Sequence, residues 1–196
     1  MRRWALVSMV TVCSCVVAAG CQDGTGTSAG FVVTGHIQNN TQTPIPANAR
    51  LIAVWGVSSG TPDYGYVFGE GTINRLFGTF RIEFDQPPPV EALNNGVLGV
   101  GLLIATTDQS LKDGDIVTGA SWTAEIIGVT AQYAVIFVDH QDSLYLNHWV
   151  ASFGSGYSVG VGVKVPGTFD KFEPVSRSSP ILIIDDLGSI EIVNWT

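Results

Sequence analysis

The sequence predicts an all-β protein, an antiparallel β-sandwich with room for at most one short helix. Short runs of β-branched and aromatic residues are separated by clusters of Gly, Pro, Asn and Asp, a spacing typical of sandwiches and barrels. Several runs alternate. In residues 79–84, Phe80, Ile82 and Phe84 share one face and charged residues take the other, as in a half-buried antiparallel strand. Strand and helix patterns do not alternate along the chain, which argues against a parallel α/β sheet.

Turn-forming residues separate the expected strands throughout the chain. Segments 58–65, 112–115 and 185–188 place Gly or Asp where a tight turn needs a positive φ or a side-chain cap. The last of these turns joins two short runs and predicts a terminal hairpin. In chain order, the expected strands cover residues 31–37, 50–57, 66–73, 79–84, 97–106, 121–128, 133–138, 158–165, 180–184 and 189–193.

One window of the chain has helical spacing. Leu146, Trp149, Val150 and Phe153 fall at positions i, i+3, i+4 and i+7, and Gly154 follows as a stop signal. This spacing predicts one short helix, or a helical turn, across one end of the sheets.

Glycines recur inside two of the expected strands, at residues 96–101 and 159–163. Neither run has the spacing of a dinucleotide-binding fingerprint, and no helical pattern follows either of them. Glycine within a strand marks a bulge or a place where another group approaches the backbone closely. We therefore interpret both runs as packing positions.

The amino terminus has the three parts of a secretion signal. Arg2 and Arg3 give a positive start, residues 4–19 form an uncharged and mostly apolar stretch, and small residues precede Cys21. A membrane-spanning helix needs about 20 apolar residues, more than this stretch supplies. We therefore expect residues 1–20 to be a cleaved signal peptide.

The last residues of this segment, Ala18-Ala19-Gly20-Cys21, resemble the lipobox of bacterial lipoproteins. The resemblance implies that Cys21 carries fatty acyl chains that insert into membrane lipid, and that cleavage occurs just before it. It also implies the outer membrane, because Gln22 stands where an Asp favours retention in the inner membrane. Two alternatives stay open: a soluble secreted protein cleaved near Ala19, and an uncleaved amino-terminal anchor.

The cysteines and the polar segment after them define the expected domain organisation. Cys13, Cys15 and Cys21 are the three cysteines of the chain, so an acylated Cys21 leaves a domain without disulfides. Residues 22–30 are polar and rich in Gly and Thr, as in a flexible linker. We expect a signal peptide at 1–20, an acylated cysteine and linker at 21–30, and a single β-sandwich domain at 31–196.

The charge balance of the chain is acidic. Its 196 residues include 9 Lys and Arg against 17 Asp and Glu, a net charge of −8. Residues 1–20 contain two arginines and no acid, so the cleaved chain has a net charge of −10. This balance, with only 13% charged residues, excludes a basic nucleic-acid binder and a charge-rich disordered tail. Anionic lipid would repel the domain, so membrane attachment must come from the acyl chains.

The amino-terminal half carries a second resemblance. Val33-Thr34-Gly35-His36-Ile37, residues 49–54 and the proline-ended run 78–88 are similar to the opening strands of carboxypeptidase-regulatory-like and transthyretin-like domains. Because those domains are prealbumin-type sandwiches, the resemblance implies a prealbumin- or immunoglobulin-like fold for this chain. A likeness of fold carries no chemistry with it.

Candidate catalytic residues are few. Ser58 lies in a G-x-S-x-G match at residues 56–60, but the helix that should follow a serine nucleophile is missing from the pattern, so we interpret the match as a hairpin loop. His36, His140 and His148 lack the spacing of metal ligands. A zinc site or a small hydrolase would require the fold to bring these histidines together.

An acidic loop suggests a possible calcium ligand set. Asp108, Asp113 and Asp115 lie within eight residues, and oxygen ligands in a turn are what Ca²⁺ uses. The loop lacks the twelve-residue EF-hand pattern, and its Asp-Gly-Asp sequence is also an ordinary β-turn. Calcium binding by this loop therefore stays an alternative.

Aromatic side chains offer a second kind of binding surface, a platform on which sugars stack. Trp55 and Trp122 fall in strand patterns and are expected in the core, whereas Tyr64 and Trp149 fall in connections and are candidates for exposure. The other aromatic residues considered for such a platform are Tyr66, Tyr133, Tyr145 and Tyr157.

Together these patterns predict a non-enzymatic, lipid-anchored protein of the bacterial cell envelope, with the outer membrane as its expected location. Acylated Cys21 would contact membrane lipid, and the loops 58–65 and 108–115 would face a partner protein or glycan. We expect no cofactor, no metal and no nucleic-acid partner. The alternatives are a glycan- or calcium-binding module and a small hydrolase.

Overall fold

The computed structural model describes residues 30–57, 64–118, 125–130, 132–140, 152–163, 171–175 and 179–187. These residues form eleven strands and one 3₁₀ turn, which confirms the all-β prediction. The elements are β1 (Phe31–Asn39), β2 (Arg50–Val57), β3 (Tyr64–Asn74), β4 (Thr79–Phe84), η1 (Val90–Ala92), β5 (Leu98–Thr106), β6 (Ile116–Val117), β7 (Ile126–Val129), β8 (Tyr133–Val138), β9 (Gly156–Val163), β10 (Lys171–Pro174) and β11 (Ile181–Ile184).

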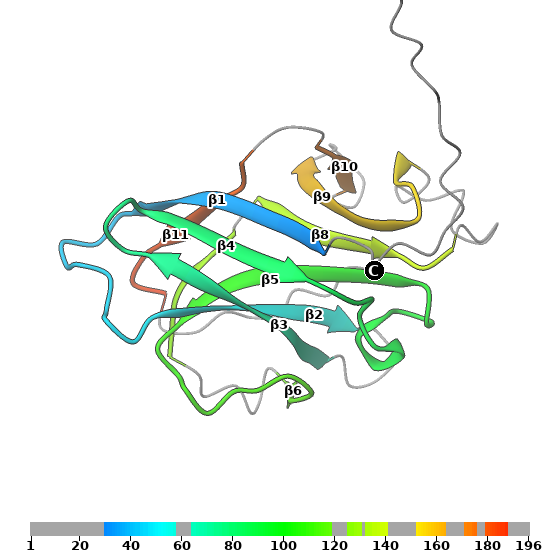
Figure 1. Ribbon diagram of the computed structural model, residues 1–196, viewed down its shortest axis with the longest axis horizontal. Helices are drawn as coiled ribbons and strands as arrows, with labels where there is room; N and C mark the ends of the chain where they lie inside the picture. The colour runs from blue at the N-terminus through cyan, green and yellow to red at the C-terminus, as the bar shows by residue number, and fades with distance from the viewer. Residues whose placement is uncertain are drawn as a thin grey trace, which may run out of the picture.

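Seven of the strands close into a barrel, so the predicted sandwich, including the prealbumin- or immunoglobulin-like form implied by the resemblance, is wrong. The ring runs in the order β5, β2, β3, β4, β1, β11 and β7, and returns to β5. Neighbours in it are antiparallel except β1 and β11, which pair in parallel from His36↔Ile181 to Asn39↔Ile184. Figure 1 shows β3, β4 and β1 side by side along one wall of this barrel.

The ring closes because β5 divides one of its edges between two partners. Its first half, Leu98–Gly101, pairs with β8, and its second half, from Ile104 to Thr106, pairs with β7. β7 in turn pairs with β11 at Ile183↔Val129 and Ile184↔Gly128. β8, β9 and β10 continue the sheet beyond the ring, and Figure 1 shows β9 and β10 above it.

The terminal hairpin predicted for the last two strands is only partly testable. β11 forms within the predicted range 180–184, but its described partners are β1 and β7. Residues 189–193, the predicted second arm, lie outside the described residues. Most of the predicted helix, over 146–153, also lies outside them, and of its apolar positions only Phe153 is described and is buried. β6, β10 and η1, each four residues or shorter, were not predicted.

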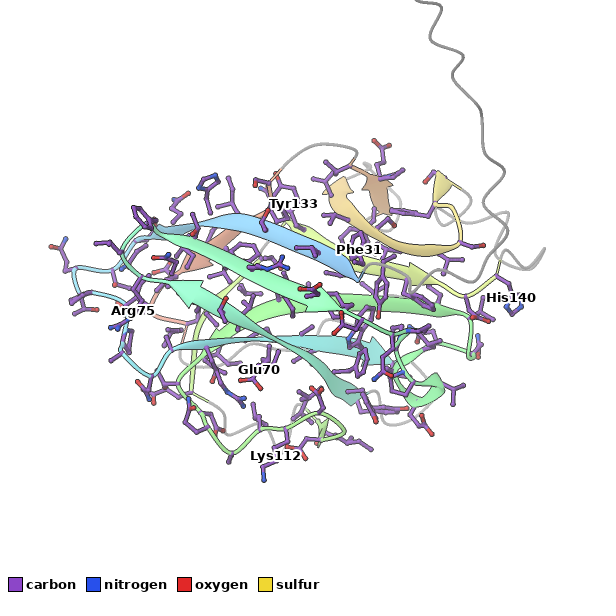
Figure 2. The ribbon with its side chains drawn as sticks, in the orientation of Figure 1. Phe31, Glu70, Arg75, Lys112, Tyr133 and His140 are labelled. Atoms are coloured by element: carbon purple, nitrogen blue, oxygen red, sulfur yellow. The ribbon has the colours of Figure 1, made fainter. Side chains whose placement is uncertain are left out.

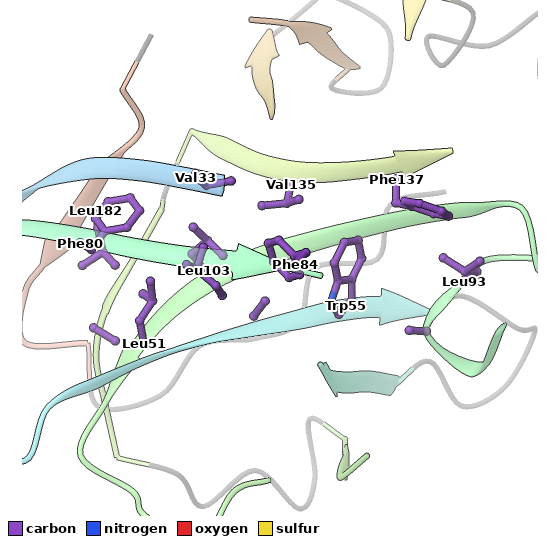
Figure 3. Close-up of a cluster of buried hydrophobic side chains, with 14 of the residues drawn as sticks. Val33, Leu51, Trp55, Phe80, Phe84, Leu93, Leu103, Val135, Phe137 and Leu182 are labelled. Atoms are coloured by element: carbon purple, nitrogen blue, oxygen red, sulfur yellow. The ribbon is translucent and has the colours of Figure 1, made fainter. Parts of the chain in front are cut away.

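Alternation along the strands builds the interior of the barrel. Residues facing inward from β1, β2, β4, β5 and β11 meet side chains of β8 in one buried apolar cluster, shown in Figure 3. Its members include Val33, Leu51, Trp55, Phe80, Ile82, Phe84, Leu93, Leu103, Phe137 and Leu182. In a domain without disulfides, the burial of such an apolar cluster is the main source of stability.

Two strands of the ring, β2 and β5, are buried on both faces. On the outer side of the barrel, Ile52, Val54 and Ile104 pack with Val117 and Ile126 in a second cluster. A third cluster joins the outer face of β5 and β8 to Phe153 and Phe172. This double burial explains why β2 and β5 have nearly continuous apolar sequences, whereas β1 and β4 alternate.

Glycines make room for large rings, as predicted for the run at 96–101. The ring of Trp55 lies against Gly99 and Gly101, where an added Cβ would approach ring atoms to 2.8 and 3.1 Å respectively. In β1, a Cβ on Gly35 would come within 2.3 Å of the Phe80 ring and 2.2 Å of the Pro180 carbonyl oxygen. The close-approach interpretation is therefore confirmed at Gly99 and Gly101.

An aromatic group centred on Tyr157 fills one end of the interior. The Tyr157 ring stacks on Phe84 at 5.0 Å and on Phe31 at 5.3 Å, and it meets Phe137 edge-on at 4.8 Å between centroids. Its hydroxyl donates a 2.8 Å hydrogen bond to the carbonyl oxygen of Gln86. Because Tyr157 belongs to β9, these contacts fix the β8–β9 layer to β1 and β4 of the ring.

Burial raises the pKa of the Tyr157 hydroxyl above its ordinary value of 10.0. The hydroxyl therefore loses its proton at a lower pH in the unfolded chain than in the folded chain. The protonated Tyr157 hydroxyl makes its full contribution to the free energy of unfolding below pH 10, and this contribution falls as the pH rises further. We expect the melting temperature of Tyr157→Phe to fall less steeply than that of the wild type between pH 9 and about 12. Melting curves recorded across this pH range measure the effect. The difference between the wild-type and Tyr157→Phe profiles separates the contribution of Tyr157 from that of the other tyrosines. Parallel profiles would contradict the expectation.

Candidate functional site

Several residues singled out from the sequence lie outside the described residues. They are Cys21, most of the linker 22–30, Ser58, Trp122, Tyr145, His148 and Trp149. The predictions that depend on them, the acylated cysteine above all, stay predictions.

The two described histidines occupy different elements. His36 lies on the outward face of β1 and is exposed, as its place in the alternating pattern predicts. His140 follows β8, and its Nδ1 lies 2.9 Å from Asp139 Oδ2 in an exposed pair, at the edge of the molecule marked in Figure 2. Within the described ranges, no three His, Cys, Asp or Glu side chains are arranged to hold a metal ion.

The three aspartates of the acidic loop have separate partners. Asp108 accepts hydrogen bonds from the Ser110 hydroxyl and backbone N–H, which hold the pKa of its carboxyl below the ordinary value. Asp113 Oδ1 accepts from the backbone N–H of Gly69 at 3.0 Å, and Asp115 Oδ2 accepts from that of Lys112 at 2.8 Å. Each carboxylate thus stabilises a turn or fastens the loop, in place of forming one set of ligands.

This loop is also fastened to the barrel by Arg50. The guanidinium of Arg50 donates to the carbonyl oxygens of Asp108 and Leu111 and forms an ion pair with Glu70 at 3.1 Å. Leu111 and Val117 cover the outer apolar cluster of β2 and β5. The described loop 107–117 therefore serves to cover a part of the core.

The described aromatic residues do not form the exposed row that a sugar-stacking platform needs. Trp55 has no exposed surface, and its Nε1 donates to the carbonyl oxygen of Phe68 at 2.8 Å, as expected for a core residue. Tyr64, a candidate for exposure, is half-buried and donates from its hydroxyl to the Glu91 carbonyl oxygen at 2.8 Å. Tyr157 lies in the aromatic group described above.

A polar groove of about 470 Å³ crosses the outward face of β1, β4 and β3. Sequence reasoning missed this groove. The groove is lined by Thr34, Gly35 and His36 of β1, Thr79, Phe80 and Arg81 of β4, Thr72 and Asn74 of β3, and Ser179 just before β11.

Strand register arranges the outward side chains of this groove in two rows. Arg81 of β4 lies opposite Thr34 of β1 on one side and Thr72 of β3 on the other. In the second row, Thr79 lies opposite His36 and Asn74 in the same way. Directly opposed residues have Cβ atoms about 4.5–5.5 Å apart, so each row spans about 10 Å.

Hydrogen bonds at its borders hold the groove in shape. The Ser179 hydroxyl donates to the Thr34 carbonyl oxygen at 3.3 Å. Asn74 Oδ1 accepts the backbone N–H groups of Leu76 and Phe77, each at 3.2 Å, and so fixes the turn between β3 and β4. Gly78 completes that turn with a φ of 59°, which glycine adopts readily.

Arg81 is the central charge of the groove. Its Nη2 lies 2.5 Å from Glu83 Oε2, and both side chains are nearly half exposed. Glu83 lies on the same face of β4 but is not among the lining residues. The groove thus presents hydroxyls, an amide, an imidazole and a guanidinium, and its described lining contains no carboxylate.

The turn beside the groove carries exposed apolar side chains. Leu76 and Phe77 are 85% and 73% exposed, and Arg75 precedes them at one end of the molecule in Figure 2. Arg75 and Leu76 line a second hollow that adjoins the first through Thr72 and Asn74.

No helix in the described part of the chain has the length and apolarity needed to cross a membrane. In comparisons with protein-family models, curated proteins and solved structures, the chain matches none of them.

Proposed function

We propose that this protein is a non-enzymatic lipoprotein of the bacterial cell envelope, held in the outer membrane by acyl chains on Cys21. The observation that carries the proposal is Ala18-Ala19-Gly20-Cys21 directly after a positively charged start and an apolar stretch. Two or more acyl chains anchor a protein stably, whereas one chain binds only marginally. A net charge of −10 after cleavage gives the domain no attraction of its own to anionic lipid.

The tether places the barrel near the lipid. Nine residues, 22–30, separate Cys21 from the first strand at Phe31. At about 5–6 Å × √n, such a chain has a typical reach of about 15–18 Å. The barrel would therefore stay within about one domain diameter of the membrane surface, and the residues on its outer faces would be displayed there.

A binding role, in place of a catalytic one, agrees with the groups that the described surface offers. His140 is paired with an exposed Asp139, and the loop aspartates serve as turn caps. The groove over β1, β4 and β3 is lined by hydroxyls, an amide, an imidazole and a guanidinium, groups that can hydrogen-bond a ligand. The groove joins the loop 108–115 as a candidate contact surface, since Leu111 of that loop packs on the core while residues 109, 110 and 112–114 are exposed.

Replacing Cys21 tests the anchor directly. We expect the wild type expressed in bacteria to incorporate a fatty-acid analogue and to sediment with membranes, and Cys21→Ser to lose the label entirely, since serine offers no thiol for acylation. Cys13→Ser and Cys15→Ser are matched controls that should keep the label, because both lie within the cleaved segment. Equal labelling of wild type and Cys21→Ser would overturn the proposed anchor.

A further inference from the structure

The groove over β1, β4 and β3 brings together hydrogen-bonding side chains from three neighbouring strands. Thr34, Thr72 and Thr79 each offer a hydroxyl that can donate or accept a hydrogen bond. They flank Arg81 and His36 in the two cross-strand rows, on strands whose inward faces carry the core. The outward faces of β2 and β5, in contrast, are covered by apolar clusters. This wall of the ring is therefore open to a polar ligand.

This wall carries charged side chains of both signs, because Glu83 and Glu70 lie on the same outward face as Arg81. Of the four Lys and Arg whose side chains are described, Arg81 lies in the groove and Arg75 lines the adjoining hollow. Arg50 is committed to Glu70 and two carbonyl oxygens, and Lys112 lies in the loop that covers the core. Glu83 contacts a single nitrogen of the Arg81 guanidinium, which carries five N–H donors in a planar fork. The fork matches the geometry of a carboxylate, sulfate or phosphate.

The volume of the groove and its lining residues limit the class of ligand that it can bind. A volume of about 470 Å³ lies within the usual range for small-molecule sites. The Phe80 ring beneath the groove points into the barrel and is buried, so Phe80 offers no aromatic face to a ligand in the groove. A ligand that gains from this lining must carry several hydroxyl groups and one oxyanion.

We propose that this groove binds an acidic saccharide, with the oxyanion on the Arg81 guanidinium and sugar hydroxyls hydrogen-bonded along Thr34, Thr72 and Thr79. Glu83 then acts as an internal competitor that the ligand's oxyanion displaces from Arg81. This site is independent of Cys21, so its test and the acylation test fail or succeed separately.

Calorimetric titration of the full chain, kept soluble in a neutral detergent, measures binding. The probes are trigalacturonic acid and sulfated maltotriose, which distinguish a carboxylate from a sulfate, with maltotriose and sodium sulfate alone as controls. We expect at least one acidic trisaccharide to bind at least tenfold more tightly than either control, and the affinity to fall as salt increases. No binding by either acidic trisaccharide would overturn the proposal. If maltotriose binds as tightly as the acidic trisaccharides, the oxyanion does not contribute to recognition, and the proposal is wrong on that point. If sulfate alone binds as tightly, the sugar hydroxyls do not contribute, and the assignment of a saccharide is wrong.

Two substitutions on β4 have opposite expected effects. Arg81→Gln removes the charged donor and is expected to weaken binding about ten- to a hundredfold. Glu83→Gln removes the competitor and is expected to strengthen binding about two- to fivefold, the range set by an exposed ion pair. Lys112→Gln, a charge change in the loop 107–117, is the matched control and should leave affinity unchanged. Melting curves check that each variant is folded. Equal affinities of Arg81→Gln and wild type, or a loss of affinity in Glu83→Gln, would overturn the assignment.

Discussion

Replacing Trp55 by alanine is expected to lower the free energy of unfolding by about 3–5 kcal/mol, the cost typical of removing a large buried ring. The Trp55 side chain has no exposed surface and meets Phe84 edge-on at 5.9 Å between centroids. Its ring also fills the space that Gly99 and Gly101 leave open on β5. Neither glycine can extend a side chain into the resulting cavity. Urea denaturation, with the midpoint and slope fitted separately, measures the loss.

Trp55→Phe is the control for this prediction, because it keeps an aromatic ring between the two glycines. It gives up the hydrogen bond from Nε1 to the Phe68 carbonyl oxygen and part of the ring area, so its loss should be clearly smaller than that of alanine. A loss below about 1 kcal/mol for Trp55→Ala, the typical effect of an average substitution, would show that the ring does not fill the interior.

Replacing Leu182 by alanine is expected to cost about 2–5 kcal/mol, because it weakens the strand that closes the barrel. Leu182 is fully buried in the same cluster as Leu51 and Phe80. It belongs to β11, which is held to β7 by only two residue pairs. Side-chain burial therefore contributes much of what keeps β11 in the ring. The loss is measured by the same denaturation experiment.

Ile181→Ala is a matched control for Leu182→Ala. The two residues are neighbours in β11 and have side chains of equal size, but Ile181 is 41% exposed and faces outward. We expect a loss well under that of Leu182→Ala, since the truncated side chain already contacts water. Similar losses at the two positions would contradict the inward placement of Leu182 and with it the closed ring.

Most of the strands could be predicted from the sequence because each of them is a local pattern. The alternation of Phe80, Ile82 and Phe84 with charged residues places β4 on the barrel wall with the correct face inward. The prediction for β8, Tyr133–Val138, matches the structure residue for residue. Trp55 was expected in the core for the same reason, since it lies in an apolar run.

The candidate site could not be predicted, because it depends on register between strands. Thr34, Thr72 and Arg81 look like ordinary outward residues of three separate half-buried strands. Only the pairings Thr34↔Arg81 and Thr72↔Arg81 bring them into one row. The loop aspartates, considered as an alternative calcium ligand set, show the converse relation between sequence and space. They are close in sequence, but Asp113 turns to the Gly69 backbone while Asp108 turns to Ser110.

The sequence by itself determined the all-β class, the inward face of β4, and the close approach at the β5 glycines. Composition, periodicity and turn chemistry act over a few residues, so they can be read along a single chain. Only the tertiary structure decided that the sheet closes into a barrel. Closure requires β5 to share one edge between β7 and β8, and β11 to pair in parallel with β1, some 145 residues away in the chain. Such long-range pairings are chosen by how the whole set of apolar faces is buried together, and no local pattern records that choice.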